Sequence, residues 1–378
     1  MRLCDEILAW VILTRAPALG APALAVALER LGSAGGILAA SDAARECAGI
    51  PAAARAYLER AARVREAERR WLEEPRHHLL PFTDPKYPKL LAGLADRPIA
   101  LYLAGDLDAL ATAQVAVVGS RNPSPQGIDS AFEFAHSLAQ RGVAITSGLA
   151  QGIDTAAHRG ALAAQGTTLA ILGSGADVIY PSSNRRLCEA IVYEGALVSE
   201  FALGTPPRRA HFPRRNRLIA ALGLGILVVE AALGSGSLIT ARAARALGRA
   251  VFAIPGSIGN PLSRGCHQLI KSGAKLTETT DDILCGLSFS PFFAGRSGEG
   301  AGAASREGKP SGMDKEHKIL LDALGFDPVD LDMLIVRTGF KPQAVSSMML
   351  ILELEGHVQA APGGRYARVA NRRAGGER

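Results

Sequence analysis

The residues best suited to chemistry in this sequence form a cluster of arginines between Thr205 and Glu230. Five arginines lie close together with one histidine and one phenylalanine among them: Arg208, Arg209, Arg214, Arg215 and Arg217, with His211 and Phe212. No acidic residue lies between Glu200 and Glu230. A basic run that contains an aromatic ring is typical of a surface that binds a polyanion, with nucleic acid as the leading candidate. The alternative is a solvated arginine face that binds nothing.

The elements next to the arginines predict that their positions are fixed. The basic run leads into an apolar helical segment and then into a strand over Ile226 to Val229. A disordered tail would carry the same charge without fixed positions, and composition alone does not separate the two cases. The adjoining helix and strand favour an ordered surface.

Length and composition bound the class of protein. The chain has 378 residues, 48% of them apolar, and a net charge of +6, which is consistent with an acidic partner. The length allows two or three domains. The five cysteines (Cys4, Cys47, Cys188, Cys266 and Cys285) lack the spacing of metal ligands, so we expect reduced thiols and no metal. No signal peptide or membrane span is readable, and we expect a soluble, cytoplasmic protein with no membrane association.

Residues 79–287 have the pattern of an α/β domain. Short apolar, β-branched runs alternate with helical stretches, at Val115–Val118, Val143–Thr146, Thr168–Leu172, Ala196–Ser199, Ile226–Val229 and Val251–Ile254. Strands that are apolar throughout and alternate with helices indicate a doubly wound, mostly parallel sheet with helices on both faces.

The flanking segments predict two further domains. Residues 1–75 read as helices, and a plain helical domain is favoured over a helix-hairpin-helix or sterile-alpha-motif-like module. Residues 288–312 have the composition of a flexible linker. Residues 313–370 read as three helices and a hairpin turning at Gly363-Gly364, which is the order of a winged helix. Its third helix offers only Lys341 and Gln343 for base contacts, which favours packing or protein contact over DNA reading.

Glycine-bearing loops follow three successive strands of the predicted sheet. They are Gly119-Ser120-Arg121, the segment from Ser147 to Gly152, and Gly173-Ser174-Gly175. Loops at the carboxyl ends of parallel strands emerge at one edge of the sheet, where such folds bind their ligands. Glycines and helix N-termini suit phosphate groups there, and the segment Ser235-Gly236-Ser237 opens a further helix. Arg121 adds a guanidinium group that can pair with two phosphate oxygens at once.

Other chemistries find less support in the sequence. The order GxGxxG and the Walker pattern GxxxxGK[ST] are missing, so we expect no NAD, no ATP hydrolysis and no cofactor. Asp154 and His158 are four residues apart on one helix, which would suit an acid–base pair. The favoured interpretation is that Asp154 caps the helix and His158 bonds to a neighbouring loop. No catalytic residue is predicted.

Several long motifs, all in one order, give the chain a specific resemblance to a known family. They are VAVVGSR (115–121), SGLAQGIDTAAH (147–158), GSGADVIYP (173–181), HFPRRNRLIA (211–220), GSGSLITARAARALGRAVFAIPG (234–256) and SRGCHQLIKSGA (263–274). In these motifs the chain resembles the DNA-processing protein A family (DprA/Smf), strongly over residues 79–287 and more loosely in the winged helix.

The resemblance implies an extended Rossmann-like domain that binds single-stranded DNA without sequence preference, with no enzymatic activity. It also implies a homodimer, protection of incoming strands during natural transformation, and help in loading the RecA recombinase. The apolar pair Leu269-Ile270 is a candidate for self-association, with burial in the core as the alternative.

The resemblance and the loops together predict a set of DNA-binding residues. Arg121, Arg214 and Arg217 would contact phosphates, and Phe212 would stack on a base. One departure is Gln151, where the family usually has arginine, and Arg208 and Arg209 are candidates to compensate. The full predicted set is Gly119, Ser120, Arg121, Ser147, Gly148, Gly152, Gly173, Phe212, Arg214, Asn216, Arg217, Ser235, Gly236 and Ser237.

Two competing functions are weighed against DNA binding. A nucleotide phosphoribohydrolase of the lysine-decarboxylase-like (LOG) group resembles this architecture but carries PGGxGTxxE, whose glutamate acts on the sugar. The corresponding segment here, GSGSLITARAA, has no acid after the glycines. A winged-helix transcription factor with a ligand-sensing domain is disfavoured by the nearly cation-free third helix.

Overall fold

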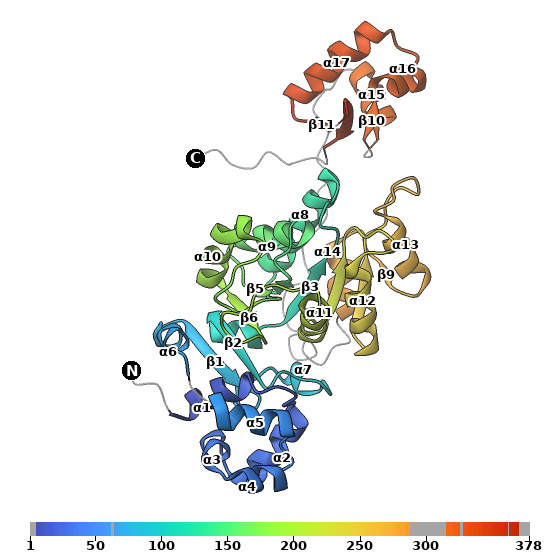
Figure 1. The fold of residues 1–378 in the computed structure, drawn as a ribbon. Helices are drawn as coiled ribbons and strands as arrows, with labels where there is room; N and C mark the ends of the chain where they lie inside the picture. Colours follow the sequence, from blue (N-terminus) through green and yellow to red (C-terminus); the bar gives the residue numbers. More distant parts are fainter. Residues whose placement is uncertain (1–4, 62–63, 288–314, 326–327, 362, 370–378) are drawn as a thin grey trace. The chain divides into compact units, whose positions relative to one another are not determined.

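A computed structural model describes residues 5–61, 64–287, 315–325, 328–361 and 363–369 (Figure 1). The chain divides into two compact units, residues 1–296 and residues 297–378. The predicted linker, residues 288–312, lies outside the described residues. The predicted separation of residues 1–75 from residues 79–287 as domains of their own stays a prediction.

The first unit begins with short helices that share a core with the edge of the sheet. The helices are α1 (Asp5–Thr14), α2 (Ala21–Leu31), α3 (Ala34–Ala39), α4 (Asp42–Cys47), α5 (Ala52–Ala61) and α6 (Glu66–Glu73). Ser33 and Ser41 cap α3 and α4 by accepting hydrogen bonds from backbone N–H groups. The Thr14 hydroxyl meets the Tyr102 hydroxyl of the sheet at 2.8 Å. Apolar side chains of α1 and α2 pack with Leu79 and Tyr102 in one cluster.

The centre of the first unit is a nine-stranded sheet in the order β1-β2-β6-β5-β4-β3-β7-β8-β9. The pairs from β6 through to β9 are parallel, and β1 and β2 pair antiparallel at one edge. The strands are β1 (His77–Pro81), β2 (Ala100–Gly105), β3 (Gln114–Val118), β4 (Ala144–Ser147), β5 (Thr168–Ile171), β6 (Ala196–Ser199), β7 (Gly225–Val228), β8 (Ala250–Ala253) and β9 (Lys275–Leu276). The predicted doubly wound, mostly parallel sheet is confirmed.

Helices cover both faces of this sheet because the strand side chains alternate between two cores. Val115 and Val117 of β3 pack with α8, α9 and α14, whereas Ala116 and Val118 pack with α11 and α12. The connecting elements are η1 (Leu107–Ala111), α7 (Lys89–Ala92), α8 (Pro125–Gln140), α9 (Ile153–Ala163), η2 (Ser182–Asn184), α10 (Arg185–Glu194), α11 (His211–Leu222), α12 (Gly236–Ala246), α13 (Arg264–Lys271) and α14 (Thr280–Leu287).

The segment from Pro75 to Pro98 is rich in proline and still contributes to the sheet. It begins with strand β1, in which Pro81 lies opposite Ala100 of β2. A proline is tolerated there because β1 is the edge strand and one side of its backbone needs no partner.

The strand order reverses next to β3, and this reversal creates the site. From β3 the chain winds through β4 and β5 to β6 on one side, then crosses to β7 on the other side. The loops after β3 and β7 therefore diverge, and a cleft opens between them at the carboxyl edge of the sheet.

The second unit has a core of its own and the order of a winged helix. It consists of α15 (Lys315–Leu324), β10 (Val329–Asp330), α16 (Leu331–Thr338), α17 (Pro342–Leu354), β11 (Val358–Ala361) and β12 (Arg365–Arg368). Leu320, Leu334, Val345 and Leu352 are central to its core. The hairpin turns at Gly363-Gly364, where both residues have positive φ angles that favour glycine. The predicted winged helix is confirmed.

Candidate nucleic-acid interface

A cleft of about 310 Å³ lies at the carboxyl edge of the sheet, and we refer to it as the sheet-edge cleft. It is formed by the loops after β3 and β4, one side of α11, and the N-terminus of α12. Its lining residues are Val118, Gly119, Arg121, Ala150, Asp154, Phe212, Arg215, Asn216, Ile219, Ser235, Gly236, Ser237 and Thr240. Seven of the predicted binding residues are therefore together in one cleft: Gly119, Arg121, Phe212, Asn216, Ser235, Gly236 and Ser237.

The loop after β3 is held in a fixed shape, with Arg121 exposed at its tip. The Ser124 backbone N–H and hydroxyl donate to the carboxylate of Glu230, at 2.9 and 2.6 Å. The Ser124 hydroxyl oxygen also accepts from Gly127 N at 3.0 Å and caps α8. The Ser120 carbonyl accepts from Ile153 N at 3.1 Å, which joins this loop to the start of α9. Burial raises the pKa of the Glu230 carboxyl, and the hydrogen bonds from Ser124 oppose that rise.

The predicted residues of the loop after β4 form an inner wall. The buried Ser147 hydroxyl donates to the Val117 carbonyl at 2.7 Å. Gly152 has φ of +80°, and a Cβ atom there would lie 2.5 Å from the Ser120 carbonyl oxygen. Asp154 closes this loop by accepting from Gly148 N at 3.1 Å and Ala150 N at 3.2 Å. These residues shape the cleft and offer few atoms to a ligand.

His158 is a buried, neutral structural residue. Its Nδ1 atom lies 2.7 Å from the Thr168 hydroxyl, on strand β5 instead of the loop that was expected. Burial, together with the nearby charge of Arg215, lowers the pKa of His158 to about 3. An imidazole that stays neutral and fully buried does not serve as an acid–base partner for Asp154.

Arg215 is the organising residue of the cleft; the sequence placed it in the arginine cluster but not in the predicted set of DNA-binding residues. Its side chain is buried, and Nη1 donates to the carbonyls of Gly148 and Ile171, at the carboxyl ends of β4 and β5. Its Nε donates to the Asn216 side-chain oxygen at 2.9 Å. Burial lowers the pKa of Arg215 to about 10, with the charge of Asp154 opposing, so the guanidinium is protonated at neutral pH.

A signal for this burial was present in the sequence. Arg215 shares the helical phase of Leu218, Ile219 and Leu222, which are three, four and seven residues later and all buried. A helix face with that spacing points into the core, so this arginine differs from its exposed neighbours. Because the whole run is highly charged, the position of Arg215 on the buried face of the helix was overlooked.

Phe212 forms part of the cleft wall, and two arginine guanidinium groups lie close to its ring. The Cζ atoms of Arg121 and Arg215 lie 5.2 and 6.0 Å from the ring centroid. A Cβ atom on Gly173 would lie 3.1 Å from the ring carbon Cδ1. Gly173 therefore lets the ring lie against the loop after β5. Tyr180 lies on another side, with its ring centroid 6.0 Å from that of Phe212.

Arg214 and Arg217 are tied to a buried acid. Glu200, directly after β6, receives Nη2 of Arg214 at 3.1 Å and Nη2 of Arg217 at 2.5 Å. Asp96 also pairs with Nε of Arg217 at 3.1 Å. The Arg214 side chain is 61% exposed, whereas that of Arg217 is 16% exposed. The guanidinium of Arg214 is thus accessible to a ligand, whereas that of Arg217 is largely buried beside its acidic partners.

The N-terminus of α12 closes the far side of the cleft. The Ser235 hydroxyl accepts from Ser237 N at 3.3 Å and lies 2.6 Å from the Ser237 hydroxyl. Gly236 is exposed at the first turn of this helix. Free N–H groups and the positive end of the helix dipole at such a position stabilise a negative charge.

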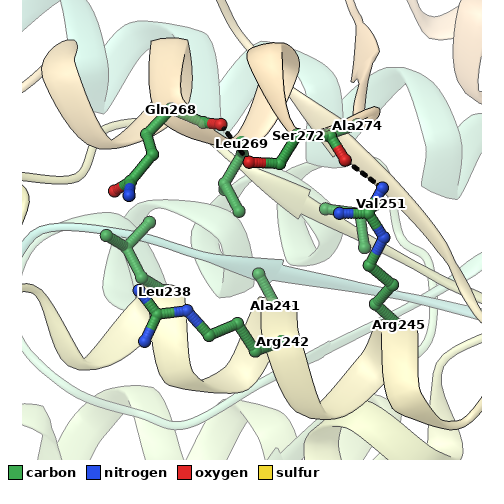
Figure 2. Close-up of a pocket in the computed structure, with 9 residues that line it drawn as sticks. All are labelled: Leu238, Ala241, Arg242, Arg245, Val251, Gln268, Leu269, Ser272 and Ala274. Carbon is green, nitrogen blue, oxygen red and sulfur yellow. Dashed lines mark hydrogen bonds between the residues drawn. The ribbon is translucent and has the colours of Figure 1, made fainter.

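A second hollow, of about 210 Å³, lies between α12 and α13, apart from these loops (Figure 2). Figure 2 shows Arg242 and Arg245 on α12, opposite Gln268 and Leu269 on α13 and Ser272 at its C-terminus. Leu269 lines this hollow, and Leu269 and Ile270 are partly buried against the core. Within the part of the chain that the structure describes, no cluster of His, Cys, Asp or Glu is arranged to hold a metal ion. No helix among those same residues is long and apolar enough to cross a membrane.

A cationic cleft at the edge of a doubly wound sheet, in one chain with a winged helix, defines a DNA-binding protein of Rossmann-like fold. Comparison with known families agrees. The model described as DNA recombination-mediator protein A matches residues 78–288, and the model described as the DprA winged helix domain matches residues 304–364. The chain belongs to the DNA recombination-mediator protein A family, as the sequence motifs predicted.

Relatives of the chain span most of its length. It is 45% identical to protein Smf of Escherichia coli K12 over 300 residues, which is 79% of each chain. The solved structure of DNA processing protein A from Streptococcus pneumoniae has a TM-score of 0.64 and 36% identity, covering 75% of this chain and 98% of that one. DNA processing protein A from Helicobacter pylori, solved to describe its single-stranded DNA binding mode, has a TM-score of 0.51 and 30% identity, covering 56% and 95%.

Proposed function

We propose that this protein binds single-stranded DNA in the sheet-edge cleft and acts as a recombination mediator. In this role it shields incoming strands during natural transformation and helps load the RecA recombinase onto them. It acts in the cytoplasm, without catalysis and without a cofactor. The observation that carries the proposal is the fixed, exposed Arg121 over the ring of Phe212, facing the N-terminus of α12 across one cleft.

The chemistry of the cleft suits a flexible polyanion of any sequence. Arg121 and Arg214 offer charge to phosphates, and the start of α12 offers N–H groups. Aromatic rings accept any base, because every base has a π face. The H. pylori relative, which binds single-stranded DNA, supports this ligand.

The predicted residues divide into two proposed roles. We assign contact with DNA to those that line the cleft or are exposed beside it: Gly119, Arg121, Arg214, Asn216, Ser235, Gly236 and Ser237. We assign the shaping of the cleft to those held by internal hydrogen bonds, ion pairs or close packing: Ser120, Ser147, Gly148, Gly152, Gly173, Phe212 and Arg217.

The phosphoribohydrolase alternative requires a carboxylate open to a bound sugar. Asp154 is the acid that lines the cleft, and its carboxylate accepts from two backbone N–H groups beside Arg215. Glu230 is occupied in the same way by Ser124. The cleft therefore favours binding over hydrolysis.

The test is a binding titration with matched oligonucleotides. Fluorescence anisotropy would compare a labelled single strand of about 30 nucleotides with the same sequence as a duplex, with and without ATP. We expect tight binding of the single strand, weaker binding of the duplex, and no effect of ATP. Equal affinity for both forms, or no binding to either, would refute the proposal.

A further inference from the structure

Tyr180 is an exposed aromatic residue beside the cleft, next to Phe212. The residue is 48% exposed and lies in the segment between β5 and η2. Its ring centroid lies 6.0 Å from that of Phe212, with 46° between the ring planes. Exposing a large ring costs solvation free energy, so an exposed ring next to a binding cleft is a candidate contact surface.

Phe212 itself offers little free ring surface to a base. The guanidinium of Arg121 lies over the ring, that of Arg215 lies 6.0 Å from its centroid, and Gly173 packs against one edge. A base stacked on Phe212 would first have to displace Arg121. The ring of Tyr180 has no such cover among the ring contacts of the described residues, where its neighbour is Phe212.

The backbone that carries Tyr180 is held at several points. The Ser174 hydroxyl donates to the Val178 carbonyl at 2.7 Å, and the Ser199 hydroxyl donates to the Ser174 carbonyl at 2.6 Å. After the tyrosine, the buried Asn184 side chain donates to the Leu149 carbonyl at 3.0 Å. These bonds join the segment to β6 and to the loop after β4. A ring on a fixed segment loses less conformational entropy on stacking than a ring on a free one.

We infer that Tyr180 is a base-stacking residue of the sheet-edge cleft, with Phe212 as the inner half of an aromatic pair that supports Arg121. The inference rests on the proposed single-stranded DNA function and specifies how bases are held. A phosphate beside Arg121 would leave its base free to turn outward onto the exposed ring. Stacking on a phenol ring discriminates little between bases, so sequence preference should stay weak.

The test compares Tyr180→Ala and Tyr180→Phe with a matched control. Tyr193 on α10 is 73% exposed and lies near Arg76, so Tyr193→Ala removes an exposed tyrosine elsewhere. We expect Tyr180→Ala to weaken single-strand binding roughly fivefold to a hundredfold, with an unchanged salt slope. Tyr180→Phe and Tyr193→Ala should bind within about twofold of the parent chain, since the stacking ring is kept or untouched.

An abasic strand of the same length separates stacking from other effects. It has the same phosphates and no bases, so the parent chain and Tyr180→Ala should bind it equally. If Tyr180→Ala fails to fold, Tyr180→Leu keeps apolar bulk without a π face and should show the same loss. Undiminished single-strand binding by Tyr180→Ala and Tyr180→Leu, together with weakened binding by Arg121→Ala, would overturn the inference and leave the proposed function standing. Absence of single-strand binding by the parent chain would overturn both.

Discussion

Arg214, Arg215 and Arg217 are close neighbours on α11, and their side chains lie in three different surroundings. Arg215 is buried and holds two backbone carbonyls of the sheet edge. Arg217 is largely covered by Glu200 and Asp96, and Arg214 shares Glu200 but is more than half exposed. Removing each guanidinium should therefore have a different effect, on DNA binding in some cases and on folding stability in others.

Arg121→Ala should change the salt dependence of DNA binding. A phosphate contact releases counterions, so its loss should flatten the log–log salt slope for single strands by about 0.7. Affinity for poly-dT and for mixed sequence should fall alike, because a phosphate contact carries no sequence information. Arg141→Ala is the control, since Arg141 follows α8 at the opposite end of the strands and pairs with Asp281. An unchanged slope for Arg121→Ala would argue against a phosphate contact.

Arg217→Ala should mainly lower the free energy of unfolding, with a smaller effect on the salt slope of DNA binding. Removing this arginine leaves the Glu200 carboxylate, 3% exposed, with the exposed Arg214 as its remaining ionic partner among the described residues. Breaking such a buried pair costs on the order of 3 kcal/mol. Urea unfolding would measure the loss, and the double variant Glu200→Gln, Arg217→Ala should recover part of it. Full stability in the single variant would show that the pair contributes little.

At the scale of elements, much of the sheet could be predicted, because apolar runs bounded by glycine loops are strong local signals. The strands from β3 to β8 lie within about a residue of the predicted ranges. Strands β1, β2 and β9 were not predicted; β1 and β9 are the edge strands of the sheet, and β9 has only two residues. The pairing of β2 with β6 joins segments that are far apart in the sequence.

The site was harder to predict than the sheet, and the acids show why. The sequence has no acidic residue between Glu200 and Glu230. In the folded chain, however, these two flanking acids both contact residues of the site. Glu200 pairs with two of the arginines, and Glu230 fixes the loop that carries Arg121. Such pairings arise only when β6, β7 and α11 are packed together.

The contact between α9 and β5 should make stability depend on pH through His158. The folded pKa is about 3, below the ordinary value of 6.5 in the unfolded chain. Between these values the unfolded state binds a proton that the folded state does not, so stability falls as pH is lowered. The slope reaches at most about 1.4 kcal/mol per pH unit.

Urea unfolding between pH 7.5 and 4.5 would measure this dependence. The variant His158→Gln lacks the titrating group, so its stability should fall less steeply than that of the parent chain. His136→Gln on α8, a half-buried histidine stacked on Phe132, serves as the control. Equal slopes for His158→Gln and the parent chain would contradict a neutral buried imidazole.

At the scale of the whole molecule, the winged-helix unit should be dispensable for single-strand binding. Its third helix, α17, starts beside Lys341 and carries no other cation. The unit also has a core of its own. A chain limited to residues 1–288 should therefore keep its affinity to within tenfold, or about 1.4 kcal/mol. Anisotropy at fixed salt would test this, with circular dichroism to show that the shortened chain is folded; a larger loss would assign the winged helix a part in binding.

Self-association is the second prediction at this scale. Leu269 lines the hollow between α12 and α13 and is partly exposed, so it can take part in a contact between two copies. Light scattering at micromolar concentration should give about twice the mass of one 39.5 kDa chain. A single-chain mass across that concentration range would show that Leu269 and Ile270 serve the core alone.

The contact between Arg215 and Gly148 has a consequence for how relatives of this chain can diverge. A Cβ atom at position 148 would lie 2.4 Å from Nη1 of Arg215, so the guanidinium would have to move from its present place to admit it. Alanine at position 148 should be tolerated only with a shorter residue at position 215, which would then give up the carbonyls that the guanidinium now holds. These two positions, 67 residues apart, should therefore change together during evolution or stay as they are.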